Sequence, residues 1–155
     1  MYNHAPPDYT CPICVGITGI KNEHTLIREP DIVYKDEKIA VIINSFSLGG
    51  IVGNALVVPT MHYENVYDVP SELGGHIFSM VQKVARAMKQ AYSCEGITTM
   101  QCNEPAGGQH AFHYHHHVMQ RNDNDDFFVR VTQKKVADPE QRASYARKLQ
   151  SILQS

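Results

Sequence analysis

The sequence predicts an α+β protein built on a twisted antiparallel sheet, with one long central helix and a second helix near the C-terminus. Short stretches rich in valine and isoleucine alternate with brief polar turns, a pattern typical of neighbouring strands. A long middle segment and the C-terminal tail carry apolar residues at helical spacing instead. Strands joined by short connections pair antiparallel, and amphipathic helices cover one face of such a sheet.

Five strands are expected, in chain order. The first two lie at residues 32–34 and 38–44, around a polar turn at 35–37, and the third lies at 54–59 after a glycine-rich loop. The β-branched segment 96–102 and the segment 111–120 supply the last two strands.

The long helix begins after Pro70, which suits a first helical turn, and ends before Gly96. The tail helix spans residues 139–153, with Asp138 as its N-cap and Gln141 in the position of a capping box. Both helices present one apolar face. In the long helix this face comprises Leu73, Ile77, Met80, Val81, Val84, Met88, Ala91 and Tyr92; in the tail helix it comprises Tyr145, Leu149, Ile152 and Leu153.

The chain of 155 residues suits a single domain over residues 1–155, with a loose arm at 1–10. Its formal net charge of -2 argues against a nucleic-acid partner. The longest apolar run, residues 39–43, is far too short to cross a membrane, and the N-terminus has no features of a secretory signal. We therefore expect a cytoplasmic protein with reduced cysteines.

The most unusual stretch is QHAFHYHHHVMQR, residues 109–121, which holds five of the nine histidines. Side chains alternate across a strand, so His113, His115 and His117 are expected on one face, with successive Cβ atoms roughly 6.5–7 Å apart. The opposite face would carry two aromatic side chains, a histidine and a valine, and would face the core. A helix would scatter the three rings.

Three interpretations of this histidine row are open. It can be a solvated polar face, a chelating site for one ion, or a site of phosphoryl chemistry in which one imidazole attacks and a neighbour donates hydrogen bonds. The preceding segment, NEPAGGQ, favours the third. Gly107 and Gly108 can turn backbone N–H groups toward an anion, and Asn103 and Gln109 add amide donors.

A separate pattern lies near the N-terminus, where Cys11 and Cys14 have the two-residue gap that lets two thiolates meet one metal ion. A thioredoxin-like context for a redox pair is absent. The alternative is that both cysteines are small buried apolar residues. Further ligands would have to come from distant parts of the chain.

The segment NEPAGGQHAFHYHHHVMQR resembles the signature of the histidine-triad (HIT) family of nucleotide hydrolases and transferases. The resemblance extends over residues 11–121 and includes the CPIC motif, Asn44 and the segment LVVPTMHYENVYDVP. Residues 122–155 match only as a generic C-terminal segment. The resemblance implies a HIT-like fold and a homodimer.

The resemblance also implies a reaction at the α-phosphate of a purine nucleotide. His115 would attack the phosphorus atom, and water would then release a nucleoside monophosphate from the nucleotidyl-histidine. His117 would hydrogen-bond the phosphate or the leaving group, and His113 would orient its neighbours. Adenosine phosphoramidates, aminoacyl adenylates and dinucleoside polyphosphates are the candidate substrates.

The same resemblance assigns the binding residues. Asn44 would hold the ribose hydroxyls, Gln109 a phosphate oxygen, and Asn103 would act near the leaving group. In one branch of the family the CxxC pair is joined by two histidines, which here implies a structural Zn²⁺ site. Its ligands would be Cys11, Cys14, His62 and His113.

Several positions depart from the family pattern, and three of them in particular leave other functions open. Asn54 replaces a histidine, His110 replaces a small or polar residue, and Gln120 replaces a proline. One alternative is a nucleotide-binding module with little or no turnover. Another is a metal-dependent hydrolase in which His113, His115 and His117 hold a catalytic ion.

Overall fold

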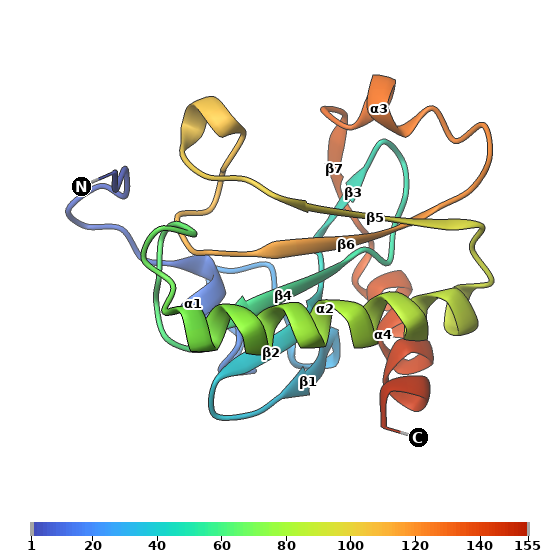
Figure 1. The fold of residues 1–155 in the computed structure, drawn as a ribbon, viewed down its shortest axis with the longest axis horizontal. Helices are drawn as coiled ribbons and strands as arrows, with labels where there is room; N and C mark the ends of the chain where they lie inside the picture. Colours follow the sequence, from blue (N-terminus) through green and yellow to red (C-terminus); the bar gives the residue numbers. More distant parts are fainter. Residues whose placement is uncertain (1, 155) are drawn as a thin grey trace.

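The computed structural model describes residues 2–154 and has the α+β architecture expected from the sequence. Its main sheet is antiparallel, and its five strands lie in the order β1-β2-β4-β6-β5 (Figure 1). The strands are β1 (Ile32–Lys35), β2 (Ile39–Ile43), β4 (Ala55–Pro59), β6 (His116–Arg121) and β5 (Gly96–Gln101).

Four α-helices surround this sheet: α1 (Pro12–Gly16), α2 (Ser71–Tyr92), α3 (Phe127–Arg130) and α4 (Pro139–Leu153). The long helix and the tail helix are confirmed, and α4 has the predicted bounds. Its N-cap is also as expected, because the Asp138 carboxylate accepts the Gln141 N–H at 3.0 Å. Short 3-10 turns lie at Glu29–Asp31 and Pro105–Gly107.

The larger core lies between the sheet and the two long helices. The α2 helix crosses one face of the sheet, and α4 lies beside it (Figure 1). Val84 and Met88 of α2 are fully buried in the same apolar cluster as Val41 and Val57 of the sheet. The two helices meet where the rings of Tyr92 and Tyr145 pack edge to face, 4.9 Å apart. Tertiary burial of apolar area therefore holds both helices in place.

The opposite face of the sheet forms the floor of a second layer. Ile42 pairs with Leu56, and Leu56 pairs with His117, so these three residues lie side by side across β2, β4 and β6. Residues 11–27 cover part of this face, where Cys11 and Ile13 join a smaller apolar cluster. His117 therefore lies in the same row as the apolar side chains of Ile42 and Leu56.

The segment 45–53 was predicted to be a loop, and that prediction was wrong in part. It contains β3 (Phe46–Leu48), which pairs with β7 (Lys134–Val136) in a separate two-stranded sheet. The partner strand lies in the C-terminal segment, so no local pattern signals the pairing. The C-terminal segment thus supplies α3, β7 and α4.

The strand predicted at 111–120 was also wrong at its start, because β6 begins at His116. Its partner β4 ends at Pro59, which has no backbone N–H to donate to a continuing ladder. The chain leaves the sheet there, and the Tyr114 N–H donates to the Tyr63 carbonyl at 2.6 Å instead. His113 and His115 therefore precede the strand rather than lying within it.

The predicted N-terminal arm contains no helix or strand among residues 2–10, but several hydrogen bonds connect it to the rest of the chain. The His4 ring lies 3.0 Å from the Glu104 carboxylate, and the backbone of His4 donates to Glu64. Within residues 2–154, no helix combines the length and apolar character needed to cross a membrane.

A buried ion pair anchors α4 to the sheet. Arg142 is 1% exposed, and its Nε lies 3.2 Å from Oδ1 of Asp31. Its terminal nitrogens donate to the carbonyls of Leu26 at 3.0 Å and Ser45 at 3.4 Å. Burial raises the pKa of Asp31, while Arg142 opposes that shift. The guanidinium therefore joins three segments that are distant in sequence.

Replacement of Arg142 with methionine should lower the free energy of unfolding by about 3 to 5 kcal/mol, because it leaves a buried carboxylate and two carbonyls without their partner. Urea denaturation followed by circular dichroism measures this. Arg147→Met is the matched control, since Arg147 lies on the same helix and is exposed. Equal stability of the two variants would contradict the assigned role of Arg142.

Candidate active site and metal centre

A cavity of about 380 Å³ lies over the row formed by Ile42, Leu56 and His117. Apolar side chains from residues 12–27 line one wall, including Ile13, Leu26 and Ile27. The polar lining residues include Asn44, His110, His115, His117 and Lys134. An apolar pocket with a few convergent polar groups is the usual form of a small-molecule site.

His115 has one ring nitrogen committed to the backbone. Its Nδ1 lies 2.7 Å from the carbonyl oxygen of His113, and a carbonyl only accepts hydrogen bonds, so Nδ1 carries the proton. Nε2 of the neutral ring then holds a lone pair. Burial is the main cause that lowers the pKa of His115, and the nearby charges of His110 and Lys134 lower it further. The ring is therefore neutral and nucleophilic near neutral pH.

His117 lies beside His115. It is the second residue of β6, and both histidines line the cavity. The two ring centroids are 4.9 Å apart, with planes inclined at 71°. Burial, followed by the charges of His115 and His116, lowers the pKa of His117 to about 3. Its Nδ1 is buried and has no hydrogen-bond partner among residues 2–154. A neutral ring with uncommitted hydrogen-bonding capacity is thus available to a ligand.

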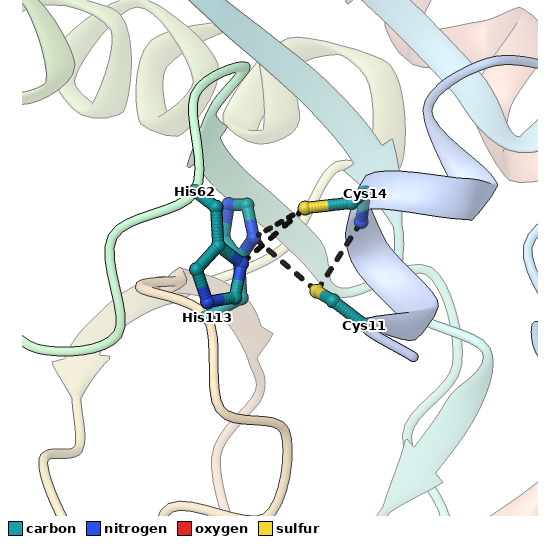
Figure 2. A group of neighbouring side chains, drawn as sticks. All are labelled: Cys11, Cys14, His62 and His113. Carbon is teal, nitrogen blue, oxygen red and sulfur yellow. Dashed lines mark hydrogen bonds between the residues drawn. The ribbon is translucent and has the colours of Figure 1, made fainter. Parts of the chain in front are cut away.

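The ring of His113 turns instead toward the cysteines of α1 (Figure 2). Its Nδ1 lies 3.4 Å from Sγ of Cys11 and 3.3 Å from Sγ of Cys14, and His62 Nδ1 lies 3.4 Å from Cys14 Sγ. The four donor atoms all lie within 4.8 Å of one another. This cluster of Cys11, Cys14, His62 and His113 can hold a metal ion.

The donor set fits a tetrahedral metal ion in both geometry and charge. Zinc bond lengths imply sulfur-to-nitrogen separations of about 3.5 Å between ligands, close to the three distances above. His113 Nε2 lies 3.0 Å from the Pro59 carbonyl and so carries the proton, which leaves the Nδ1 lone pair for a metal. Burial and the neighbouring Cys11 raise the pKa of Cys14 to about 12. A bound cation would offset the free-energy cost of ionising the Cys14 thiol.

His113 connects the two centres. Its side chain belongs to the metal cluster, and its backbone carbonyl accepts the Nδ1 proton of His115. Burial lowers the pKa of His113 to about 4, so its ring stays neutral in the cluster. The position of His113 thereby sets the orientation of the His115 ring, which faces the cavity.

The other predicted site residues lie in two different places. Asn44 lines the cavity, and its Oδ1 accepts the Phe46 N–H at 3.0 Å. Gln109 is buried outside the lining, with its amide bonded to the Glu64 carbonyl and the Glu104 N–H, both at 2.7 Å. Asn103 lies outside the lining as well, and its Oδ1 accepts the Val66 N–H at 2.7 Å.

The three departures from the family pattern are also separated. Asn54 is fully buried and donates to the Ile51 carbonyl at 3.1 Å, while Gln120 donates to the Val52 carbonyl at 2.6 Å. Both side chains therefore support the turn before β4. His110 alone lies at the cavity.

Sequence reasoning missed three cavity-lining residues with titratable side chains, namely Glu23, His24 and Lys134. All three are exposed, and they come from loops or from the short strand β7. Exposed charged residues are the norm on any surface. Nothing in their local sequence distinguished them, because their position depends on how distant segments fold together.

The fold agrees with comparisons with known proteins. The HIT domain family model matches residues 28–124, more than half of the chain. The protein therefore belongs to the HIT family.

Individual relatives support this assignment. The chain is 35% identical over 99 residues to Protein hit of Bacillus subtilis, which covers 64% of this chain and 67% of the relative. A Zn-bound histidine triad family protein from Mycobacterium smegmatis superposes with a TM-score of 0.74 at 25% identity, covering 94% of each chain. Adenylylsulfatase HINT3 of Arabidopsis thaliana is 25% identical over 112 residues, 72% of this chain and about half (54%) of the relative.

If the cluster holds a metal ion, replacement of Cys11 with serine should leave the purified protein without it, because a hydroxyl is a far poorer ligand than a thiolate for a soft-donor site. Elemental analysis of metal per chain measures this. Cys102→Ser serves as the control, since Cys102 lies outside the cluster and is half-buried. Full metal content in the Cys11 variant would rule out the cluster as the binding site.

Proposed function

We propose that the protein is a nucleotide hydrolase or transferase that cleaves at the α-phosphate through a covalent intermediate on His115. The observation that carries this proposal is the 2.7 Å contact between His115 Nδ1 and the His113 carbonyl. It leaves the Nε2 lone pair as the nucleophile in a cavity of nucleotide size.

In the first step the Nε2 lone pair attacks the α-phosphorus, and the bond from phosphorus to the leaving group breaks. The leaving group departs with that electron pair and takes up a proton if it is basic. In the second step the oxygen of a water molecule attacks phosphorus, and the bond to Nε2 breaks. The nucleoside monophosphate leaves, the water gives up a proton, and His115 regains its neutral form.

His117 would support both steps. Its neutral ring carries one N–H, which can donate to a phosphate oxygen or to the leaving group as negative charge builds up there. Its edge-to-face position beside His115, 4.9 Å between centroids, places that donor next to the reacting atoms. His113 would act through its carbonyl as a positioning residue.

The remaining contacts would bind a purine nucleotide. Asn44 would donate from Nδ2 to the ribose hydroxyls, since its Oδ1 is already bonded to the backbone. The apolar wall with Ile13, Leu26 and Ile27 would enclose the base. Gln109 and Asn103 would hold the glycine-rich segment in shape through their backbone contacts, and so bring Gly108 to the phosphate. A homodimer is the expected assembly.

The metal at the cysteine cluster would be Zn²⁺ in a structural role. Two cysteines and two histidines complete a four-coordinate site with no open position for substrate. The Mycobacterium smegmatis neighbour, a Zn-bound histidine triad family protein, supports this choice. The ion would fasten α1 to the segment that carries His113 and His115.

Two alternatives make different demands on the same residues. A metal-dependent hydrolase would need His113, His115 and His117 on one ion, whereas His113 Nδ1 faces the two sulfurs and His115 Nδ1 donates to a carbonyl. Such an enzyme would lose activity on chelation while staying folded. A binding module without turnover would bind a nucleoside monophosphate yet form no adduct.

The variant His115→Ala should lose activity on adenosine phosphoramidates and dinucleoside polyphosphates by roughly four orders of magnitude or more, as for other covalent nucleophiles, and should keep its fold. Mass spectrometry of the quenched wild-type reaction should find a nucleotidyl group on His115. His116→Gln is the matched control, because His116 is adjacent but does not line the cavity. Unchanged turnover in the His115 variant would end the proposal.

Zinc affinity should rise steeply with pH between 6 and 8. Both thiols must lose protons to bind the ion, and the raised pKa of Cys14 means that its proton competes throughout this range. His113, with its pKa lowered to about 4, is already neutral and adds nothing. Competition with a chelator should give a slope of about two protons released per ion. A pH-independent affinity would show that the cysteines are not ligands.

A further inference from the structure

We propose that Lys134 is a specificity-determining residue that binds a negatively charged leaving group. This inference rests on the proposed function and selects among its candidate substrates. It favours nucleotides whose α-phosphate carries a further phosphate chain, such as dinucleoside polyphosphates, over phosphoramidates that release a neutral amine.

The position of Lys134 follows from the pairing of β7 with β3. Lys134 pairs with Leu48, and its Nζ lies 4.9 Å from the centroid of the Phe46 ring. Phe46, Leu48 and Lys134 all line the cavity. The Phe46 ring thus supports the lysine side chain on the wall made by β3, with the ammonium at the cavity rather than directed away from it.

The distribution of charge around the cavity gives this lysine its importance. Among the described residues that line the cavity, Lys134 is the one lysine or arginine, and Glu23 is the one acidic residue. The chain as a whole has a net charge of -2, so a general excess of basic residues does not account for the ammonium. Glu23 belongs to the segment that forms the apolar wall, whereas Lys134 lies on the wall made by β3 and β7, beside Phe46.

These positions define the chemistry of the leaving group. With the α-phosphorus held at His115 Nε2, the leaving group would lie in the same cavity, whose lining includes His117, His110 and Lys134. A phosphate oxygen there gains a charge-assisted hydrogen bond from the ammonium. An amine gains nothing from it, and a protonated amine is repelled. The site therefore discriminates by the charge of the group that leaves.

The position of Lys134 has an alternative explanation, in which the lysine packs on the Phe46 ring and does not contact a ligand. The neighbouring lysine separates the two explanations. Lys135 lies on the same strand, is also exposed, and points to the other face of β7, away from the cavity lining. Lys134→Met and Lys135→Met therefore remove the same charge from adjacent positions, and Lys134→Arg restores the charge at the cavity.

The test compares kcat/KM for diadenosine tetraphosphate and for adenosine 5′-phosphoramidate in the wild-type protein and these three variants. Lys134→Met should lower kcat/KM for the tetraphosphate by about 10- to 100-fold, as expected for loss of a charge-assisted hydrogen bond. The phosphoramidate value should change by less than about threefold. Lys134→Arg should recover most of the loss, and Lys135→Met should match the wild type.

An equal loss on both substrates, or no loss on the tetraphosphate, would overturn the assignment of Lys134. Absence of turnover on both substrates by the wild-type protein would instead contradict the proposed function. Titration calorimetry with AMP and ADP then decides the inference by itself. Lys134→Met should weaken ADP binding and leave AMP binding unchanged, and equal effects on the two nucleotides would contradict the role of Lys134.

Discussion

The hydrogen bond from His115 Nδ1 to the His113 carbonyl is the constraint on which the rest of the site depends. It fixes which nitrogen of His115 is protonated, and it exists only because the chain leaves the sheet before His116. In a continuous strand that carbonyl would belong to the hydrogen-bond ladder of the sheet instead. Pro59, which cannot donate to such a ladder, makes the departure possible and also accepts the proton of the His113 ring. A single proline therefore serves both the metal cluster and the cavity.

The cavity is assembled from three parts of the chain that have different origins. The main sheet supplies the floor and His117, the segment from α1 to residue 27 supplies the apolar wall, and the β3–β7 pair supplies Lys134. The family match at residues 28–124 includes the floor and the histidines. It leaves out β7 and most of the apolar wall. Chemistry and selectivity are thus located on different elements, which is how one fold hosts several substrates.

Much of this could be predicted from the sequence, and the exceptions have physical reasons. The helical face of α2 and the N-cap of α4 are local patterns, and the structure has both. The rings of His115 and His117 lie together as expected. The prediction that His113 shares their face was wrong, because its ring turns to the cysteine cluster. The cysteine cluster could be predicted because its ligand spacing resembles a known branch of the family. The pairing of β3 with β7 could not, since each strand is three residues long and its partner is remote. Arg142 was missed because a charged residue on an amphipathic helix normally faces solvent, whereas here it is 1% exposed.

The short β3–β7 ribbon has a consequence for how the cavity could change during evolution. A shift of the β7 register by one residue turns every side chain of that strand to the opposite face. In most strands such a slip would replace a functional group with an unrelated one. Here Lys134 is followed directly by Lys135, so a slip in one direction exchanges one ammonium for another opposite Leu48. The connection between β6 and β7 could therefore gain or lose a residue while the cavity kept its positive charge.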